Sequence, residues 1–448
     1  MTQAASRREF LRRASAFAAA GIVSPYAMGF AGITAASAQN AGDYKALVYV
    51  SLGGGNDHLS TLVPYDAGGY SRYAKVRKDL SLPRTTLLPI KAPVGQSGRE
   101  IAFAPPLFGL RDLYNAGRLA IVPNVGPLVE PTTRADIDAG KAKLPRQIAS
   151  HFDQSNLWAS LNDGSGLGWG GRIADIMASA NTYPAITTVS ASGYTLFGQG
   201  RETVSYSVAD YGVPQPYFDA GSPFEAAVTG SAKRTNLLEK AYAQAHESLR
   251  DVSGTLSRAI LPDTTFGATP GGGDNELANG LRTIARLIGA SGAIGTKRQL
   301  FFVELGGFDT HNEQNIRHPE LLQKLDEALV FFDGMLGQLG MRDKVTLFTT
   351  SEFGRAFVPN GDGTDHGWGS HHFVMGGAVK GGAIYGKLPL VSVDGPDTTW
   401  YGGPMLPSTA ASQYAATLGK WMGVSDSVLG EILPDLARFN TRDLGFMG

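Results

Sequence analysis

The 448-residue chain is 43% hydrophobic and 18% charged, with a formal net charge of −1, which is typical of a globular protein with a large core. The near-neutral charge and the lack of a basic run beyond the N-terminus argue against nucleic acid as a partner. Cysteine is absent. Thiolate metal sites and thiol nucleophiles are therefore excluded, and any metal site must use carboxylate, imidazole, amide or water ligands.

The N-terminus has the pattern of a twin-arginine export signal. Two adjacent arginines lie within SRREFLR at residues 6–12, and residues 14–42 carry no charge. The run ends in ASA at residues 36–38, a small-residue cleavage site. An amphipathic helix fits poorly, because Pro25 and several glycines interrupt the run. We expect residues 1–38 to be a signal peptide read by the twin-arginine translocase, which carries folded proteins. The remainder, with no permanent membrane span, is expected to be periplasmic or extracellular.

Apolar runs and helical patterns follow in the first half of the mature chain. Residues 45–52 and 119–123 have the pattern of buried strands, and the first run leads into a glycine turn. Helices are expected at about 106–116 and from about Ser150 to Ser160. The segment at about 190–272 is polar and rich in glycine, serine and tyrosine. We expect a cap or loop insertion there, with one helix at about 234–252.

The second half alternates regularly between helices and strands. The expected elements are helices at 275–289, 319–339 and 412–422, and strands at 299–305, 344–350 and 372–379. Strands that alternate with helices predict a mostly parallel sheet covered on both faces. The expected fold class is therefore α/β, a three-layer α/β/α sandwich forming a single domain at 39–448.

Acidic residues and histidines gather in loops that follow the expected strands. The members of this set are Asp57, Asp309, His311, Glu352, Asp365 and His366. The carboxyl ends of parallel strands meet at one edge of a sheet, and several carboxylates there repel one another unless a cation neutralises them. Imidazole ligands suit zinc or manganese better than magnesium. We expect a divalent ion, namely zinc, manganese or calcium. The alternative is that Asp57 and Glu352 are helix caps.

Other histidines and one serine leave alternatives open. His246 and His318 are expected on the surface. His371 and His372 point to opposite faces of an extended run, so at most one of them faces the site. Ser150 lies at an expected helix start, where it is either a nucleophile favoured by the helix end or an ordinary N-cap.

Several motifs taken together resemble a known family. The twin-arginine start, GGGND, SHFDQ, GGFDTH, SEFGR and TDHGWGSHHFVMGG resemble the bacterial family labelled domain of unknown function 1501, over nearly all of the mature chain. That family is similar to the alkaline phosphatase and sulfatase superfamily, in which metal ligands lie at strand ends of an α/β/α sandwich. The resemblance implies an alkaline-phosphatase-like fold and a metal-dependent hydrolase of phosphate or sulfate esters. Its substrate would be a small anionic ester or an envelope polymer.

The resemblance also assigns roles to individual residues. It makes Ser150 the nucleophile, and the metal ligands that it implies are Asp57, Asp309, His311, Glu352 and His366. In such a hydrolase Arg355 would hold the anionic group. Asp309 and His311 depart from the superfamily pattern, because they are spaced Asp-x-His rather than Asp-x-x-x-His. Glu352 and Phe353 stand where that pattern has Asp and His. These departures favour one metal or a degenerate site over a complete two-metal site.

Two further hypotheses remain open. A non-catalytic cell-envelope binding or assembly protein could retain the fold, and the missing histidine after Glu352 favours it. A carbohydrate- or polymer-binding enzyme is suggested by Trp158, Trp169 and Trp368, which lie near glycine-rich loops. The alternative role of these tryptophans is packing.

Overall fold

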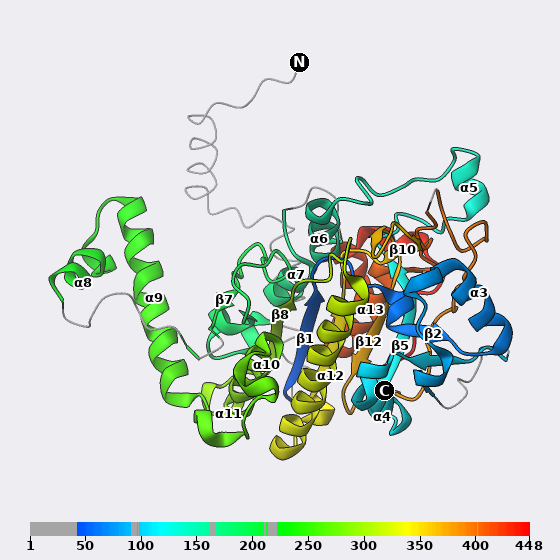
Figure 1. Ribbon diagram of the computed structural model, residues 1–448. Coiled ribbons are helices and arrows are strands. Elements are labelled where there is room, and N and C mark those ends of the chain that lie inside the picture. Colours follow the sequence, from blue (N-terminus) through cyan, green and yellow to red (C-terminus); the bar gives the residue numbers. More distant parts are fainter. Residues whose placement is uncertain are drawn as a thin grey trace.

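A computed structural model describes residues 43–90, 96, 98–161, 166–209, 212–213, 222–400 and 402–448. The predicted signal peptide at 1–38 lies outside these residues. An eight-stranded sheet forms the centre of the molecule, in the order β13-β5-β12-β9-β1-β8-β6-β7 (Figure 1). Its strands are β1 (Lys45–Leu52), β5 (Leu119–Gly126), β6 (Thr188–Ser190), β7 (Tyr206–Ser207), β8 (Arg298–Leu305), β9 (Val345–Thr350), β12 (Ser370–Met375) and β13 (Thr409–Ala410).

Parallel pairing dominates this sheet. β1 lies between β8 and β9 and runs parallel to both, with Tyr49 opposite Phe302 on one side and Phe348 on the other. β12 alone is antiparallel to its neighbours β5 and β9. β1, β8 and β9 therefore end at the same edge of the sheet, which confirms the mostly parallel arrangement expected from the sequence.

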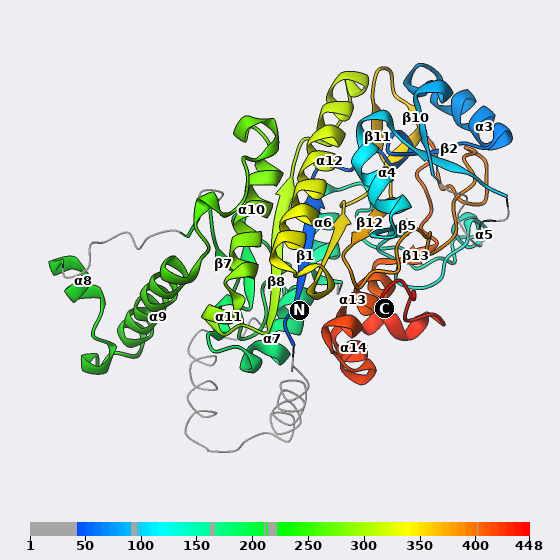
Figure 2. The ribbon, with the colours of Figure 1, turned by 90° about the horizontal axis from the view of Figure 1, so that it is seen from below.

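Side chains that alternate along β1 enter two separate cores. Val48 and Val50 pack in one hydrophobic cluster, and Leu47 and Tyr49 in another, as the two-residue period of a strand requires. Helices α4 (Phe108–Asn115), α10 (Glu276–Gly289) and α12 (Gln314–Leu339) contribute to the first cluster, and α7 (Trp169–Met177) and α13 (Ala411–Met422) to the second. Figure 2 shows these two groups of helices on opposite sides of the sheet. The three-layer α/β/α sandwich is therefore confirmed.

Smaller elements surround the sandwich. The helices are α3 (Ala67–Arg77), α5 (Arg134–Asp138), α6 (His151–Ser160), α8 (Pro223–Val228), α9 (Leu237–Ala259), α11 (Ser291–Ile294) and α14 (Asp426–Ile432). One small sheet contains β2 (Leu62–Pro64), β4 (Ile101–Phe103) and β3 (Leu88–Pro89), and another contains β10 (Arg355–Pro359) and β11 (Thr364–His366). No helix among the described residues is long and apolar enough to cross a membrane.

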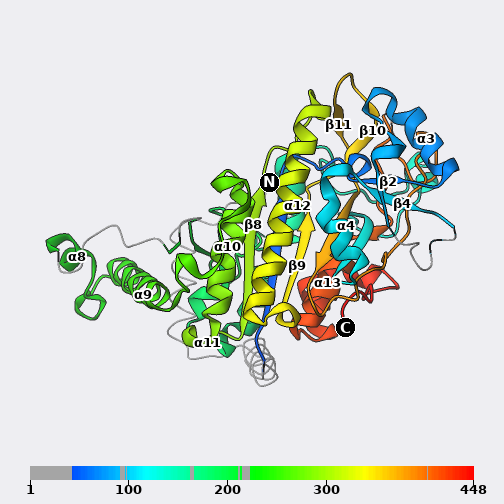
Figure 3. The same cartoon turned by 60° about the horizontal axis from the view of Figure 1, so that its bottom comes forward.

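Most expected elements are confirmed, with differences at their ends. The helix expected at 319–339 begins earlier, at Gln314, and contains Pro319 in its second turn. Because proline has no backbone N–H, the helix lacks one i→i−4 hydrogen bond at this position. The segment at about 190–272 carries α8 and α9, and α9 extends away from the sheet (Figure 3). Its role as a cap stays a prediction.

Candidate metal centre

The predicted strand-end loops do meet at one edge of the sheet. Phe308 N donates to Gly53 O at 3.0 Å, which joins the loops after β8 and β1. The loop after β9 joins them through Glu352, whose carboxylate accepts a hydrogen bond from Gly54 N at 2.8 Å. The β10–β11 ribbon pairs Arg355 with His366 and so places that histidine beside the same loops. In Figure 1, α6 lies at this end of the sheet.

Three side chains from different segments form the centre of the site. His151 begins α6, Asp309 follows β8, and His366 ends β11. One ligand atom from each lies within 4.8 Å of the others. Donors bound to one metal ion at roughly 2.0–2.2 Å are separated by distances of this order or less. Residues 151, 309 and 366 can therefore hold a single ion after small side-chain adjustments.

Hydrogen bonds fix the imidazole tautomers in this group. Nδ1 of His151 lies 2.8 Å from Oε1 of Glu352, and Nδ1 of His366 lies 2.7 Å from the carbonyl oxygen of Ala149. Because carboxylate and carbonyl oxygens only accept, each Nδ1 carries a proton, and in the neutral ring each Nε2 keeps a lone pair. The Nε2 atom of His151 is buried and has no hydrogen-bond partner among the described residues. It lies 3.5 Å from Oδ2 of Asp309.

A third imidazole repeats the pattern at the exposed rim. Nδ1 of His311 faces Oδ1 of Asp365 at 3.3 Å, which turns its Nε2 toward Asp309 at 3.2 Å. The Nε2 atoms of His311 and His366 are only 2.9 Å apart. Two lone pairs at this separation repel one another unless a proton or a metal ion lies between them. The orphaned nitrogen of His151 and this close pair both fit a bound cation, with a ligand set of imidazole and carboxylate.

The pKa values of these groups follow from their neighbours. The hydrogen bond to Glu352 raises the pKa of His151 above its ordinary value, although burial opposes this. Burial lowers the pKa of His366, which favours its neutral, metal-binding form. Burial disfavours the charged form of Asp309, but the hydrogen bond and charge of Arg355 outweigh burial and lower its pKa. Asp309 therefore stays an anion.

Arg355 is directed into the protein. Its side chain is fully buried and donates to Asp309 and to the carbonyl oxygens of Gly54, Gly55, Phe308 and Thr364. These bonds tie Asp309 to the loops after β1 and β8. These oxygens occupy the guanidinium donors, and a contact of Arg355 with an anionic substrate group stays a prediction.

Asp57 lies in a separate buried network. Its carboxylate accepts hydrogen bonds from Arg77, from Gln314, from Ser60 Oγ at 2.6 Å and, as the cap of a short 3₁₀ helix, from Leu59 N at 3.2 Å. Burial disfavours the charged carboxylate, but the Arg77 guanidinium outweighs it and lowers the pKa of Asp57 to about 2. The structure thus brings Asp309, His311 and His366 together, with Asp365 and Glu352 behind them, and leaves Asp57 apart.

Ser150 is the N-cap of α6, and its position next to His151 keeps it close to the site. Its Oγ accepts from Asp153 N at 3.3 Å and donates to the Asp153 carboxylate. Ala149, on its other side, is the residue that His366 contacts. Sequence reasoning missed His151 itself. The available signal was its place in SHFDQ, at the start of a helix that follows a central strand.

Histidines outside this group have other environments. His318 was expected on the surface, which is wrong. It is 2% exposed, and its Nε2 lies 2.9 Å from Oδ1 of Asn56 under the first glycine turn. His246 is partly buried on α9. His371 accepts a hydrogen bond from Asn124 N, whereas His372 packs on Trp158 with ring centres 5.2 Å apart. The two thus contact different neighbours, as alternation predicts.

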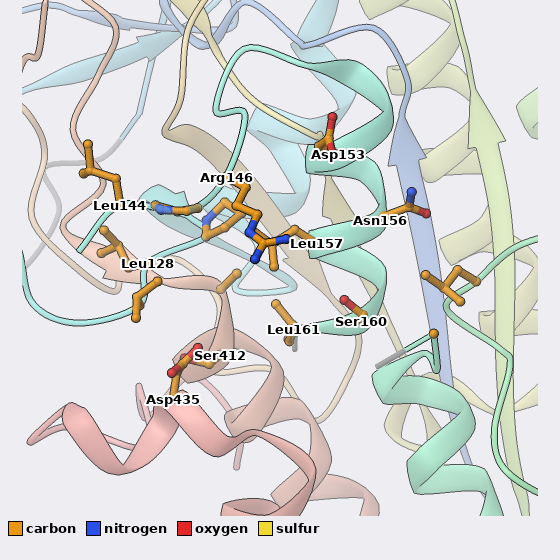
Figure 4. A pocket seen from close by; sticks show the side chains of 16 residues that line it. Leu128, Leu144, Arg146, Asp153, Asn156, Leu157, Ser160, Leu161, Ser412 and Asp435 are labelled. Atoms are coloured by element: carbon orange, nitrogen blue, oxygen red, sulfur yellow. The ribbon is translucent and has the colours of Figure 1, made fainter. Parts of the chain in front are cut away.

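Two cavities flank α6. One, of about 290 Å³, lies between α6 and the ends of β1, β8 and β9, and Glu352 forms part of its wall. The other, of about 550 Å³, lies on the opposite side of the helix. Figure 4 shows Arg146 and Leu157 beside α6 in this second cavity, with Ser412 and Asp435 on the C-terminal segments. Asn156 and Leu196 line both cavities, so the larger one continues from the smaller one, which shares Glu352 with the metal group.

The comparisons with known proteins agree with the motif pattern. A family model described as "Protein of unknown function (DUF1501)" matches residues 44–399. The chain belongs to this family. No match was found among curated proteins. DUF1501 here covers both β1 and the β10–β11 ribbon, and so spans every residue of the metal group.

Solved structures similar to this DUF1501 chain are remote. The PsFucS1 sulfatase from Pseudoalteromonas sp. is 11% identical, with a TM-score of 0.36 over 89% of this chain and 72% of that chain. The lipoteichoic acid synthase LtaP from Listeria monocytogenes is 8% identical, with a TM-score of 0.33 over 83% and 80%.

Proposed function

We propose that this chain is an exported, metal-dependent hydrolase of phosphate or sulfate esters. The observation that carries the proposal is the convergence of His151, Asp309 and His366, whose ligand atoms lie within 4.8 Å of one another. Glu352 and the carbonyl oxygen of Ala149 hold the two imidazoles with their lone pairs toward Asp309. Carboxylate–histidine–metal arrangements of this kind are typical of metal enzymes.

The donors also favour particular metals. Two or three imidazoles with one carboxylate suit zinc or manganese, whereas calcium prefers oxygen ligands alone. A divalent ion bound there would polarise an ester oxygen and stabilise the negative charge that develops in the transition state. Glu352 orients His151, Asp365 orients His311, and Arg355 fixes Asp309.

Ser150 is the proposed nucleophile. Its hydroxyl proton passes to Asp153, to which Oγ already donates. The serine oxygen then bonds to phosphorus or sulfur while the bond to the ester oxygen breaks, and the alcohol leaves after taking a proton from solvent. A water molecule hydrolyses the seryl ester in a second step. In this step Asp153 returns its proton to the serine oxygen and the water gives a proton to solvent, which restores Ser150 and releases phosphate or sulfate.

The test combines metal analysis with turnover. Purified residues 39–448, metal-free and reconstituted with zinc or manganese, are assayed for bound metal and for hydrolysis of aryl phosphate and aryl sulfate. H151A and H366A are expected to lose metal and turnover together, whereas H246A on the projecting helix keeps both. S150A is expected to keep metal and lose turnover. Absence of bound metal and of turnover with every added divalent cation would refute the hydrolase, and full activity of S150A would refute the nucleophile.

A non-catalytic envelope protein is the second candidate. The observation that favours it is the inward direction of Arg355, which leaves the anion without that cationic contact. This candidate predicts a protein that binds one metal ion tightly but turns over neither ester. The same assay separates the two candidates.

A further inference from the structure

The cavity of about 290 Å³ is placed to receive the alcohol part of an ester bound at the metal group. Glu352 lines it and also holds the ring of His151, so cavity and metal group share a wall. Its volume lies at the lower end of the roughly 300–1,000 Å³ typical of small-molecule sites. It therefore has room for about one ring-sized group.

Aromatic and hydroxyl side chains make up much of the cavity wall. Phe152 and Tyr194 line it and are 77% and 79% exposed. Apolar side chains this exposed at the mouth of a cavity offer flat faces on which the C–H face of a sugar ring can pack. Trp158, in the same wall, is 3% exposed, and its Nε1–H has no acceptor among the described residues. A buried donor without an acceptor calls for a hydrogen-bonding partner, and a ligand hydroxyl or a water molecule in the cavity would supply one.

The charged groups of the wall are both acidic. Glu304 and Glu352 line the cavity, and no lysine, arginine or histidine is among the described residues that do. Glu352 is already bonded to Gly54 N and His151. The carboxylate of Glu304 accepts a hydrogen bond from the Ser51 hydroxyl, and no cation is among the groups that act on its pKa, which burial and the charge of Glu352 raise. A polyanionic group is therefore repelled from the cavity, and a cationic group is attracted.

We propose that this cavity binds an amino sugar, a hexose-sized polyol whose protonated amine pairs with Glu304. The aromatic faces take the ring, the wall hydroxyls and the indole N–H bond its hydroxyls, and the unpaired carboxylate selects the ammonium group. The proposal rests on the proposed function for its place beside the reacting ester. It makes the substrate a phosphate or sulfate ester of an amino sugar rather than of a uronic acid.

Binding of free sugars tests the cavity without any need for turnover. Glucosamine, glucose and glucuronate are compared by saturation-transfer NMR with residues 39–448, below the pKa of the amine and with and without zinc. Glucosamine is expected to bind best and glucuronate not to bind. E304Q should weaken glucosamine binding about tenfold or more and leave glucose unchanged, because only the charge-assisted bond is lost. Y194A should weaken the binding of both glucosamine and glucose. E431Q, on the distant α14, should change the binding of neither sugar.

The outcomes separate this proposal from the proposed function. Glucuronate binding as tight as that of glucosamine, or a glucosamine affinity that E304Q does not change, would overturn the amino-sugar site even if the protein hydrolyses aryl esters. Selective glucosamine binding that depends on Glu304, without ester turnover, would support the site and refute the hydrolase.

Discussion

Substitution of Asp57 by asparagine is expected to destabilise the protein while leaving metal affinity intact. Asp57 and Arg77 form an ion pair in which both side chains are 0% exposed. Loss of the anion leaves the guanidinium charge buried without a counter-charge, which typically costs about 3–5 kcal/mol. An unfolding entropy of roughly 2 cal/mol/K per residue gives about 0.8 kcal/mol/K for a chain of this size. The melting temperature should therefore fall by about 4–6 °C.

The pH dependence of stability provides an independent check of the same pair. The pKa of Asp57 is lowered to about 2 from an ordinary value of 3.8. A carboxyl with a lowered folded-state pKa contributes stability that is fully present above about pH 4 and is lost as the pH falls toward 2. The difference corresponds to roughly 2–3 kcal/mol. The D57N variant lacks this carboxyl, so its free energy of unfolding should not show this part of the decrease at low pH.

Urea denaturation at pH 7 and below, together with zinc titration against a chelating dye, measures both properties. D138N is the matched control, because Asp138 pairs with Arg134 at the surface and is 58% exposed. It should change stability by less than about 1 kcal/mol. The reasoning is refuted by a D57N variant of wild-type stability whose zinc affinity falls tenfold. That result would make Asp57 a metal ligand, as the sequence pattern suggested.

Three other predictions concern the site and its support. E352Q should weaken metal affinity by about 10–100-fold through loss of the carboxylate that orients an imidazole, whereas E431Q should not, as measured by dye competition. G54A should weaken metal binding at least tenfold, because Gly54 has φ of 115° and an added Cβ would lie 2.3 Å from Asp309 N. G306A is its control, since nothing lies within 4 Å of the added carbon, and equal affinities of the two variants would contradict the argument. Burial lowers the pKa of His372 to about 3, so stability tied to this group is present above about pH 6.5 and lost as the pH falls below it. In urea titrations, the free energy of unfolding of H372F should fall by about 2 kcal/mol less than that of the wild type between pH 8 and 5. An unchanged dependence of this free energy on pH would contradict the role of His372.

The sequence predicted the sheet well because its central strands have simple patterns. The apolar runs that form β1, β8 and β9 are long enough to be recognised, and their register follows from alternating burial. β6, with three residues, and β7, with two, are too short to show a period. Their place at the sheet edge depends on long-range pairing, which no local pattern reports.

The site could be predicted only in part, for a physical reason that differs between residues. Asp309 and His366 were placed together in the candidate site from the sequence because they lie in glycine-rich loops at strand ends. Asp57 has the same local pattern, but α3 supplies Arg77, a partner that only the tertiary structure reveals. Arg355 was interpreted as a ligand for an anion, because sequence does not show that surrounding carbonyl oxygens occupy its donors. His151 was missed because the carboxylate that orients it, Glu352, lies 201 positions away in sequence.

The wide sequence separation of the proposed ligands has a consequence for the order of folding, metal binding and export. His366 and Asp309 are 57 positions apart, and His151 meets its supporting carboxylate across 201 positions. An incomplete chain would thus offer at most isolated donors, and the proposed site would hold an ion tightly only after β8, β9 and the β10–β11 ribbon have assembled. Metal binding would therefore come late, after the strands that are most distant in sequence have paired. The predicted twin-arginine signal would suit a protein of this kind, because that route carries folded proteins and would let the completed site bind its ion before export.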